Sequence, residues 1–277
     1  MKVAFAEVIG DPIAHSKSPL IHGFWLERLG IDAEYRAFHV RPEELPAYFT
    51  ERSGDPHWRG CNVTIPHKQS VPAFMETLDN KARRVGAVNT VYRDDTGNLR
   101  GTNTDVDGVG EAIDASSFIG GKAVVIGAGG AARAAFVQLA DMNLDEVCVL
   151  ARSPDKAAGA VGECGLRAEI QPLAQAPEAL DNACLLINAT QLGMQGQEAM
   201  PANVLDAVQG MQAEGLVFDM VYAPLETELL TAARGRGLRT SDGLVMLVGQ
   251  AATAFAKFFG QEAPRFHDED LRARLLA

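Results

Sequence analysis

The sequence has few residues of the kinds that hold metals. Its four cysteines, Cys61, Cys148, Cys164 and Cys184, form no Cys-x-x-Cys pair, and three of them lie in or beside apolar runs. Its six histidines form neither a His-x-x-x-His nor a His-Glu-x-x-His pattern, and no converging carboxylates accompany them. We therefore predict no metal site, and we expect buried free thiols in preference to disulfides or metal ligands.

Long hydrophobic runs are also missing. The apolar run that begins at Ala123 stops at Arg133, whereas a membrane-spanning helix needs about 20 such residues. The N-terminus meets Glu7 and then Asp11, so it lacks the uninterrupted apolar core of a secretory signal. We expect a cytoplasmic protein with no membrane partner.

Positive charge is scarce. The 277 residues include 25 Lys and Arg against 36 Asp and Glu, a formal net charge of −11, while 47% are hydrophobic and 22% are charged. These proportions are typical of a soluble globular protein with one large or two ordinary domains. The negative excess would repel nucleic acid and anionic membrane surfaces, so a small molecule is the expected partner.

The first hundred residues predict a mixture of helices and strands. Ser18-Pro19, an apolar helical face and Gly30 indicate a helix that begins and ends at these residues. A strand at 61–65 is stopped by Pro66, and we expect a helical segment from there to about Val85. The segments 88–93 and 99–102 flank a turn and predict a hairpin.

After Gly120-Gly121 short apolar strands alternate with helices, which predicts a doubly wound parallel sheet. The expected strands are 123–126, 146–150, 184–188 and 216–220. A mostly apolar helix with Gln250 in its middle follows at 243–259, and a charged helix closes the chain at 268–276. We therefore assign the chain to the α/β class.

A glycine-rich turn joins the first of these strands to a helix. The turn reads Gly127-Ala128-Gly129-Gly130-Ala131. Gly127 permits a tight turn, Gly129 lets backbone N–H groups approach a pyrophosphate, and the helix N-terminus supplies a positive dipole end. Such turns also arise merely to pack a helix against a strand, and Ala132 replaces the third glycine. The strand-turn-helix context favours dinucleotide binding.

The next strand indicates which dinucleotide binds. It is followed by Arg152, Ser153 and Lys156, which fit the 2′-phosphate of NADP through charge-assisted hydrogen bonds. Arg152 could instead be an ordinary solvated cation, and Asp155 could accept from the ribose of NAD. We favour NADP.

Several polar residues lie where a scaffold would not need them. Ser16 and Ser18 stand at the expected N-terminus of a helix, where a carboxylate would be favoured. Ser18 is equally well explained as a simple N-cap. Thr64 and Lys68 follow a strand, and Asn89 and Asp105 lie in turns. Each of these could be an ordinary turn residue on its own.

Taken together, these motifs resemble the shikimate dehydrogenase family. The matching segments, in family order, are 16–18, 62–68, 86–90, 103–105, 127–131, 188–190, 218–224 and 243–252. The resemblance extends from near residue 9 to about residue 255. Two departures are Ala151, where many NADP-dependent members have Asn, and Gln191-Leu192, where a Ser is frequent. The first of these leaves the degree of NADP preference open.

The resemblance implies an α/β protein of two domains. A substrate domain with a mostly parallel sheet would comprise residues 1–105 and be completed by 244–277, and a Rossmann-like NADP-binding domain would comprise 106–243. Family members reversibly reduce 3-dehydroshikimate to shikimate with NADPH, on the route to chorismate and the aromatic amino acids. The protein is then expected to be an oxidoreductase acting on a CH–OH group, as a monomer or homodimer.

The resemblance also implies site residues. The substrate carboxylate would be held by Ser16, Ser18 and Tyr222, and the ring hydroxyls and reacting oxygen by Thr64, Lys68, Asn89, Asp105 and Gln250. The cofactor would be bound by Gly127, Ala128, Gly129, Gly130, Ala131, Arg152, Ser153, Lys156, Thr190, Met220 and Gly243.

A ketone reduction requires a proton donor at the reacting oxygen. Lys68 is the expected acid in reduction and base in oxidation, with Asp105 as its partner. A quinate or aminoshikimate dehydrogenase that uses NAD is the alternative reading. A more distant alternative is a non-catalytic dinucleotide-binding sensor, which would have no use for a proton-transfer pair.

Overall fold

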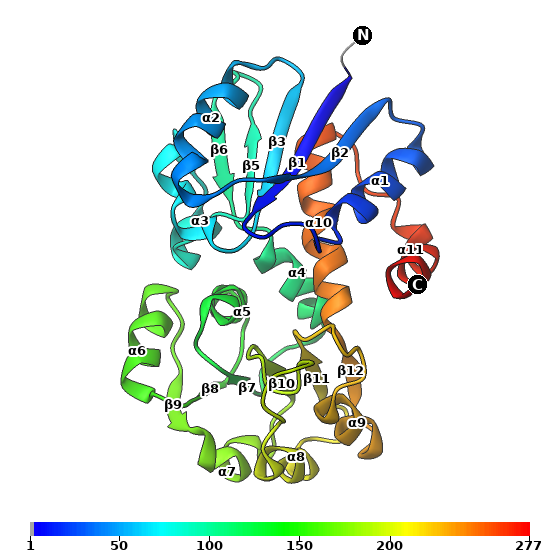
Figure 1. Ribbon diagram of the computed structural model, residues 1–277. Helices are drawn as coiled ribbons and strands as arrows, with labels where there is room; N and C mark the ends of the chain where they lie inside the picture. The colour runs from blue at the N-terminus through cyan, green and yellow to red at the C-terminus, as the bar shows by residue number, and fades with distance from the viewer. Residues whose placement is uncertain (1–2) are drawn as a thin grey trace. The chain divides into compact units, whose positions relative to one another are not determined.

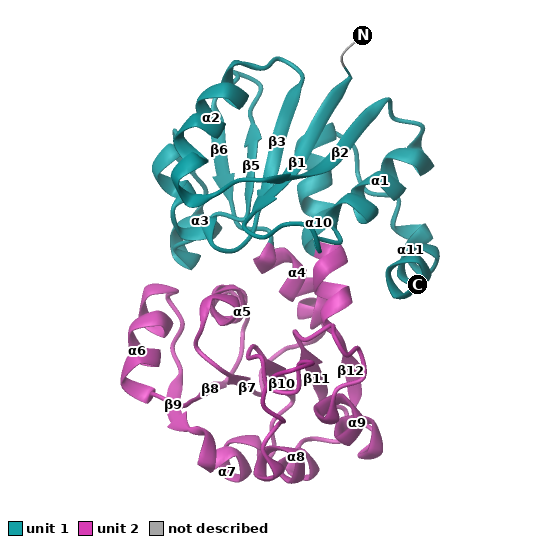
Figure 2. Cartoon of the chain, viewed as in Figure 1, with its two compact units in different colours: residues 1–104, 250–277 teal, residues 105–249 magenta. Residues whose placement is uncertain are grey.

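The computed structural model describes residues 3–277, which form two compact units (Figure 2). Unit 1 comprises residues 3–104 and 250–277, and unit 2 comprises residues 105–249. The sequence predicted the divisions after residues 105 and 243. The contacts divide the chain after Thr104 and after Gly249, so that the second division falls inside one long helix, α10 (Gly243–Phe259).

The sheet of unit 1 has the strand order β2-β1-β3-β5-β6-β4 (Figure 1). Its strands are β1 (Ala4–Gly10), β2 (Ala33–His39), β3 (Trp58–Val63), β4 (Thr77–Leu78), β5 (Thr90–Arg93) and β6 (Leu99–Thr102). Strands β2, β1 and β3 are parallel, and β5 is antiparallel to both β3 and β6. The carboxyl ends of β1, β3 and β6 therefore meet the amino end of β5 at one edge of the sheet.

Helices cover both faces of this sheet. They are α1 (Ser18–Leu29), α2 (Leu45–Gly54), α3 (Asn80–Val85) and the C-terminal part of α10, while α11 (Asp268–Leu276) packs against α1. On one face Phe5 and Ile9 pack in a cluster with Tyr48 and Phe49 of α2. On the other face an aromatic group joins α1, β2 and α10, and consists of His22, Trp25, Tyr35, Phe255 and Phe258.

A buried ion pair lies on the α2 face. The side chain of Glu7, on β1, is fully buried and accepts hydrogen bonds from Arg52 and Tyr48 of α2 and from Arg36 of β2. Burial and the nearby carboxylate raise the pKa of Tyr48 well above its ordinary value, so its hydroxyl remains a donor. The Glu7 carboxylate therefore has the partners that a buried charge needs.

Unit 2 contains a fully parallel sheet with the order β12-β11-β10-β7-β8-β9. Its strands are β7 (Lys122–Ile126), β8 (Glu146–Ala151), β9 (Glu169–Pro172), β10 (Leu185–Asn188), β11 (Leu216–Asp219) and β12 (Arg239–Ser241). Its helices are α4 (Asp105–Ala112), α5 (Gly130–Ala140), α6 (Pro154–Glu163), α7 (Ala176–Leu180), α8 (Ala202–Ala207), α9 (Glu228–Gly235) and the first turns of α10. The strand order reverses between β7 and β10, which creates the switch point at which doubly wound sheets bind ligands.

The α/β class and the parallel sheet of unit 2 were predicted correctly, but some elements differ. The helical segment expected between Pro66 and Val85 is broken into two short 3-10 turns, 67–69 and 71–74, then β4 and finally α3. Pro72 interrupts that segment, because proline has no N–H to donate to a helix. Strand β3 ends at Val63 and does not reach Ile65, and β1, β2, β9 and β12 were not predicted.

The cysteines are free thiols, as the sequence predicted. All four cysteines are free, and three of them are buried. Burial raises the pKa of Cys148 to about 11, which keeps this thiol protonated. Within residues 3–277 no helix combines the length and apolar character needed to cross a bilayer.

His22 is a buried histidine that has no polar partner among the residues described. Its ring stacks on Tyr35 at a centroid distance of 4.0 Å, and both ring nitrogens are buried without a hydrogen bond. Burial lowers the pKa of His22 from 6.5 to about 3. The imidazole is therefore neutral in the folded protein at a pH where the unfolded chain binds a proton.

The first prediction concerns stability in acid. Because the folded-state pKa of His22 lies below its unfolded value, the free energy of unfolding should fall as the pH drops from about 6.5 toward 3, by at most about 1.4 kcal/mol per pH unit. His22→Phe should remove this contribution and be at least as stable as the wild type at neutral pH. Urea unfolding of both proteins at a series of pH values measures it, and equal pH slopes would contradict the assignment.

Candidate functional site

The edge of unit 1 where β1, β3 and β6 end collects most of the predicted substrate residues. Backbone hydrogen bonds tie its loops together: Thr64 N–H donates to Ile9, Val63 N–H to Asn89, and Asn89 N–H to Thr102. A further bond runs from the Val88 N–H to the Lys68 carbonyl at 2.8 Å. Residues far apart in the sequence therefore share one rigid edge.

Asn89 is the centre of a buried polar network at this edge. Its Oδ1 accepts from the Thr104 N–H at 2.7 Å and from the Thr90 hydroxyl at 3.0 Å, and its Nδ2 donates to Thr104 Oγ1 at 3.1 Å. The Thr104 hydroxyl also lies 3.4 Å from Gln250 Oε1 on α10. The structure thus brings two predicted substrate residues, Asn89 and Gln250, to the same threonine.

The loop after β1 carries the two predicted serines. Ser18 is the first residue of α1 rather than its N-cap, and Ser16 Oγ accepts from the Ser18 N–H at 3.3 Å. The simple N-cap explanation of Ser18 is therefore wrong, because the N-cap residue is Lys17, which makes no side-chain capping hydrogen bond. Ser18 is buried.

Thr64 and Lys68 lie beyond the end of β3. Lys68 is half-buried in the short 3-10 turn 67–69, beside the fully buried His67, whose Nε2 lies 2.6 Å from the Val40 carbonyl. Thr64 approaches Gly10 so closely that a Cβ on Gly10 would lie 2.6 Å from Thr64 Cγ2. Gly10 thus makes room for Thr64 at the edge.

In unit 2 the glycine-rich turn follows β7 at the switch point. Gly127 has φ +104°, and a Cβ there would lie 2.5 Å from Thr190 Cγ2. Gly129 and Gly130 are exposed, and a Cβ on either would meet no atom within 4 Å. Helix α5 begins at Gly130 without a side-chain cap or an acidic first turn. Its first N–H groups and the open space above the glycines fit the pyrophosphate of a dinucleotide.

Three predicted polar residues surround the start of α6. Arg152 and Ser153 follow β8, and Lys156 lies in the first turn of the helix; all three are exposed. Ser153 is the N-cap residue but makes no capping hydrogen bond. Two cations and an uncapped helix N-terminus fit a phosphate group. Asp155 is exposed in the same turn.

Thr190, Met220 and Gly243 gather beyond β10, β11 and β12. Thr190 donates its hydroxyl to Asn188 Oδ1 at 2.7 Å, and the Met220 N–H donates to the Asn188 carbonyl. A Cβ on Gly243 would lie 2.4 Å from the Met220 carbonyl oxygen. Since Thr190 also touches Gly127, these predicted cofactor residues share one surface at the carboxyl edge of the sheet.

A buried carboxylate holds this second edge together. Asp219 Oδ1 accepts from Asn188 Nδ2 at 2.9 Å and from the Val221 N–H at 3.0 Å, while Oδ2 accepts from the Thr227 hydroxyl at 2.7 Å. Burial raises the pKa of Asp219, and the three hydrogen bonds oppose that rise. Asp219 thereby fixes the loops that carry Thr190 and Met220.

The predicted residues divide between the units. Unit 1 contains Ser16, Ser18, Thr64, Lys68, Asn89 and Gln250. Two predicted substrate residues, Asp105 and Tyr222, belong to unit 2 together with all the predicted cofactor residues. Asp105 directly follows Thr104, and Tyr222 is about half exposed in the loop after β11.

The sequence reading missed several residues that support these edges. All of them are buried: Thr104 is hydrogen-bonded to Asn89, Tyr35 to Asn62, and Asp219 to Asn188, which in turn accepts from Thr190. Polar residues inside apolar strands, such as Asn62 beside Cys61 and Val63, were the available signal. Their partners could not be identified without the strand register.

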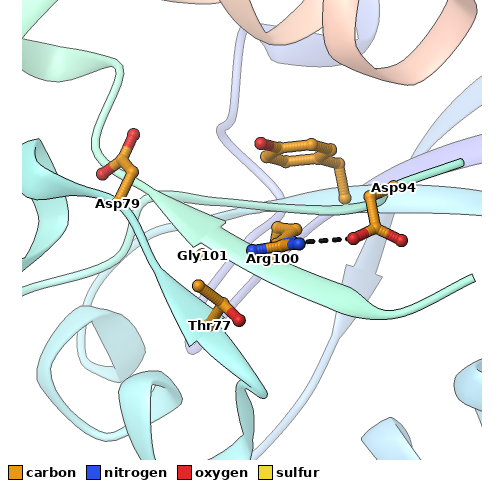
Figure 3. A pocket seen from close by; sticks show the side chains of 6 residues that line it. Thr77, Asp79, Asp94, Arg100 and Gly101 are labelled. Carbon is orange, nitrogen blue, oxygen red and sulfur yellow. Dashed lines mark hydrogen bonds and ion pairs between the residues drawn. The ribbon is translucent and has the colours of Figure 1, made fainter. Parts of the chain in front are cut away.

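A pocket in unit 1 is lined by other residues. It has a volume of about 280 Å³ and is lined by Thr77, Asp79, Tyr92, Asp94, Arg100 and Gly101 (Figure 3). Arg100 forms an ion pair with Asp94 at 2.7 Å, and the Asp79 carboxylate accepts from the Ala82 N–H and the Thr102 hydroxyl. Because its charged groups are already satisfied, the sheet edges and not this pocket are the candidate site.

Metal ligands do not converge in the part of the chain that the structure describes. No group of three or more His, Cys, Asp or Glu side chains there has a geometry suited to a metal ion. The predicted site residues are hydroxyls, amides, a carboxylate, lysines, an arginine and the glycine-rich turn.

Comparison with known proteins yields matches over nearly the whole chain. The family described as "Shikimate dehydrogenase substrate binding domain" matches residues 8–91, and the family "Shikimate / quinate 5-dehydrogenase" matches residues 112–219. A curated relative from Sphingopyxis alaskensis, "Shikimate dehydrogenase (NADP(+))", is 47% identical over 273 residues, which cover 99% of this chain and 97% of the relative.

Solved structures of shikimate dehydrogenases are also similar to this chain. The shikimate 5-dehydrogenase of Thermus thermophilus in complex with NADP(H) and shikimate has a TM-score of 0.84 and 37% identity, over 98% of this chain and 99% of its own. The shikimate 5-dehydrogenase of Listeria monocytogenes in complex with shikimate and NAD has a TM-score of 0.87 and 31% identity, over 99% and 96%.

The glycine-rich turn generates the second prediction. Gly129 has φ −81° and open space around its Cβ position, so Gly129→Ala should leave the unfolding temperature unchanged. The added methyl group would stand where the pyrophosphate approaches the backbone, and should raise the KM for NADP roughly tenfold or more, about 1.4 kcal/mol. Steady-state kinetics and thermal unfolding measure the two effects.

Gly127→Ala provides the contrast. Its positive φ and the contact with Thr190 should make this variant less stable before any cofactor binds. An unchanged KM for NADP in Gly129→Ala would show that the dinucleotide does not cross this turn.

Proposed function

The chain belongs to the shikimate dehydrogenase family, and we propose that it catalyses the reversible NADPH-dependent reduction of 3-dehydroshikimate to shikimate, with Lys68 and Asp105 handling the proton. The observation that carries the assignment is the presence of two sheet edges with complementary chemistry. One has hydroxyls, amides and a lysine around Asn89, and the other has an open glycine turn at a helix N-terminus. The reaction belongs to the route to chorismate and the aromatic amino acids.

We propose that the first edge binds the substrate. Ser16 and Ser18 stand at the N-terminus of α1, where the helix dipole favours the substrate carboxylate, and Tyr222 would complete that contact. Thr64, Asn89 and Gln250 present hydroxyl and amide groups, which suit the ring hydroxyls. A site built to hydrogen-bond hydroxyls discriminates strongly against analogues that lack them.

The second edge would bind NADP. Residues Gly127 to Ala131 would hold the pyrophosphate, and Arg152, Ser153 and Lys156 the adenosine phosphate. Thr190, Met220 and Gly243 would border the nicotinamide. When bound, NADPH supplies the hydride for the reduction.

The proton step falls to Lys68 in this proposal. Reduction of a ketone places negative charge on its oxygen, so a donor directed at that oxygen lowers the barrier. The Lys68 ammonium can donate to that oxygen in reduction and take the proton back in oxidation. Asp105 would hold the ammonium and accept a hydrogen bond from the neighbouring ring hydroxyl. Its backbone follows Thr104, which binds Asn89, so the chain delivers it to the same loop.

Four assays test the function. The absorbance of the reduced cofactor is followed with shikimate or quinate as substrate, each with NADP or NAD. The proposal expects the shikimate–NADP pair to give the highest kcat/KM. Preference for quinate or NAD would support the alternative dehydrogenase, and no turnover with any pair would favour a sensor.

We also propose where and in what form the enzyme works. A small-molecule substrate and a net charge of −11 suit a cytoplasmic enzyme that does not bind nucleic acid. A monomer or a homodimer is the proposed assembly. Sedimentation of the purified protein, with and without NADP, distinguishes them.

The third prediction concerns Lys68. Lys68→Met keeps the length of the side chain but removes the proton, and should lower kcat by about 10²- to 10⁴-fold with a smaller change in the KM for shikimate. Lys257→Met is the matched control, because Lys257 is also half-buried in unit 1 and its Nζ lies 4.6 Å from the centre of the Tyr92 ring. If Lys68→Met raised only the KM and kept kcat, Lys68 would be a binding residue.

The fourth prediction concerns Arg152. Arg152→Ala should raise the KM for NADP by roughly 10- to 100-fold, because hydrogen bonds to a charged group contribute about 1.5 to 3 kcal/mol. The KM for NAD should stay nearly unchanged, and Arg167→Ala, an exposed arginine of the same unit, should alter neither. Equal effects of Arg152→Ala on both cofactors would contradict the phosphate assignment.

A further inference from the structure

A row of polar side chains crosses one face of the unit 1 sheet just below the candidate site. The strand register pairs Asn62 of β3 with Thr90 of β5, and Thr90 with Thr102 of β6. Tyr35 reaches this row from β2. All four side chains are buried. Because strand residues alternate between faces, Thr64 and Thr104, two positions further along, continue this row at the edge.

The hydrogen bonds of the row run in one direction. The Tyr35 hydroxyl donates to Asn62 Oδ1 at 2.6 Å, and Asn62 Nδ2 donates to Thr90 Oγ1 at 3.0 Å. The Thr90 hydroxyl then donates to Asn89 Oδ1 at 3.0 Å. Each group donates a hydrogen bond to the next one. The Tyr35 hydroxyl is the first donor and therefore sets the direction of the row.

This direction determines how the Asn89 carboxamide is turned. Its Oδ1 faces the donors of Thr90 and Thr104, and its Nδ2 consequently faces away from Thr90, on the side of Thr104 Oγ1. A carboxamide turned the other way would place an N–H against the Thr104 N–H. The hydrogen bonds of the row therefore determine that a ligand at the edge would meet the Nδ2 group of Asn89 and not its Oδ1.

Burying these polar side chains costs free energy that apolar side chains at the same positions would not. Buried polar groups need partners, and Val or Leu would fill the same positions without that requirement. The alternate residues of β3 and β5, Cys61, Val63 and Val91, are apolar and pack into the core of the other face. Burial raises the pKa of Tyr35 well above its ordinary value, so its hydroxyl stays protonated and remains a donor.

We propose that Tyr35 and Asn62 are positioning residues for substrate binding: acting through Thr90, they hold Asn89 with its N–H group directed to a ring hydroxyl of the substrate. The inference rests on the proposed function, because it takes Asn89 as a substrate ligand. Tyr35 and Asn62 need not touch the substrate. They determine the orientation of the Asn89 carboxamide, whose N–H group the substrate would contact.

The test compares two buried tyrosines of unit 1. Tyr35→Phe removes the first donor of the row, whereas Tyr48→Phe removes an equivalent buried hydroxyl that donates to Glu7 on the opposite face. Both variants should lose stability in thermal unfolding, Tyr48→Phe at least as much as Tyr35→Phe, because the Tyr48 hydroxyl donates to a charged carboxylate. Only Tyr35→Phe should raise the KM for shikimate, by about 5- to 30-fold, with kcat reduced less and the KM for NADP unchanged.

Asn62→Asp reverses the polarity of the row without changing its shape. The carboxylate of this variant can only accept when it is ionised, so it would draw the Thr90 hydroxyl away from Asn89, whereas the protonated carboxyl can donate again. Relative to the wild type, its KM for shikimate should be raised more at alkaline than at acid pH. A pH-independent ratio would contradict the proposal, and if this variant does not fold, Tyr35→Phe decides alone.

The wild type separates the two claims. If it does not oxidise shikimate, the proposed function fails. If it does, but Tyr35→Phe keeps the wild-type KM for shikimate or Tyr48→Phe raises it equally, the function stands and the positioning role is overturned.

Discussion

The carboxamide oxygen of Asn89 accepts hydrogen bonds from two separate groups, and the edge of the first sheet is organised around it. The donors are the Thr104 N–H and the Thr90 hydroxyl. They come from the loop after β6 and from the start of β5, and Thr104 extends the network to Gln250 on α10. A group buried this deeply must be satisfied, so these loops have one arrangement and not several.

In unit 2 a buried charged group, the Asp219 carboxylate, holds the loops in one arrangement. Asp219 ends β11, and its carboxylate accepts hydrogen bonds from three groups, on Asn188, Val221 and Thr227. In both units, side chains that would contact a ligand are held by buried polar groups one layer below. Open parallel sheets bind ligands at the carboxyl ends of their strands, because the loops that follow the strands meet there. The buried networks make those loops rigid enough to place atoms accurately.

The sequence predicted the elements whose signals are local. The hairpin, the parallel strands from Ala123 onward and helix α10 follow from turn residues and apolar periodicity, and the last of these was predicted with its observed bounds. Short edge strands such as β9 and β12 have weak local patterns and depend on pairing with β8 and β11. The roles of Tyr35 and Asn62 were invisible for a related reason: their hydrogen bonds join residues 27 positions apart, which only the strand register brings together.

Both tryptophans of the chain lie in unit 1. Trp25 packs against Phe255 in α10, and Trp58 lies at the start of β3; each is fully buried. Intrinsic tryptophan emission is thus a spectroscopic signal of one unit alone, while the circular dichroism of helices and strands reports on both. A denaturation followed by the two signals would coincide if the units melt as one cooperative body. Divergence of the curves would identify which half of the protein unfolds first, without any added label.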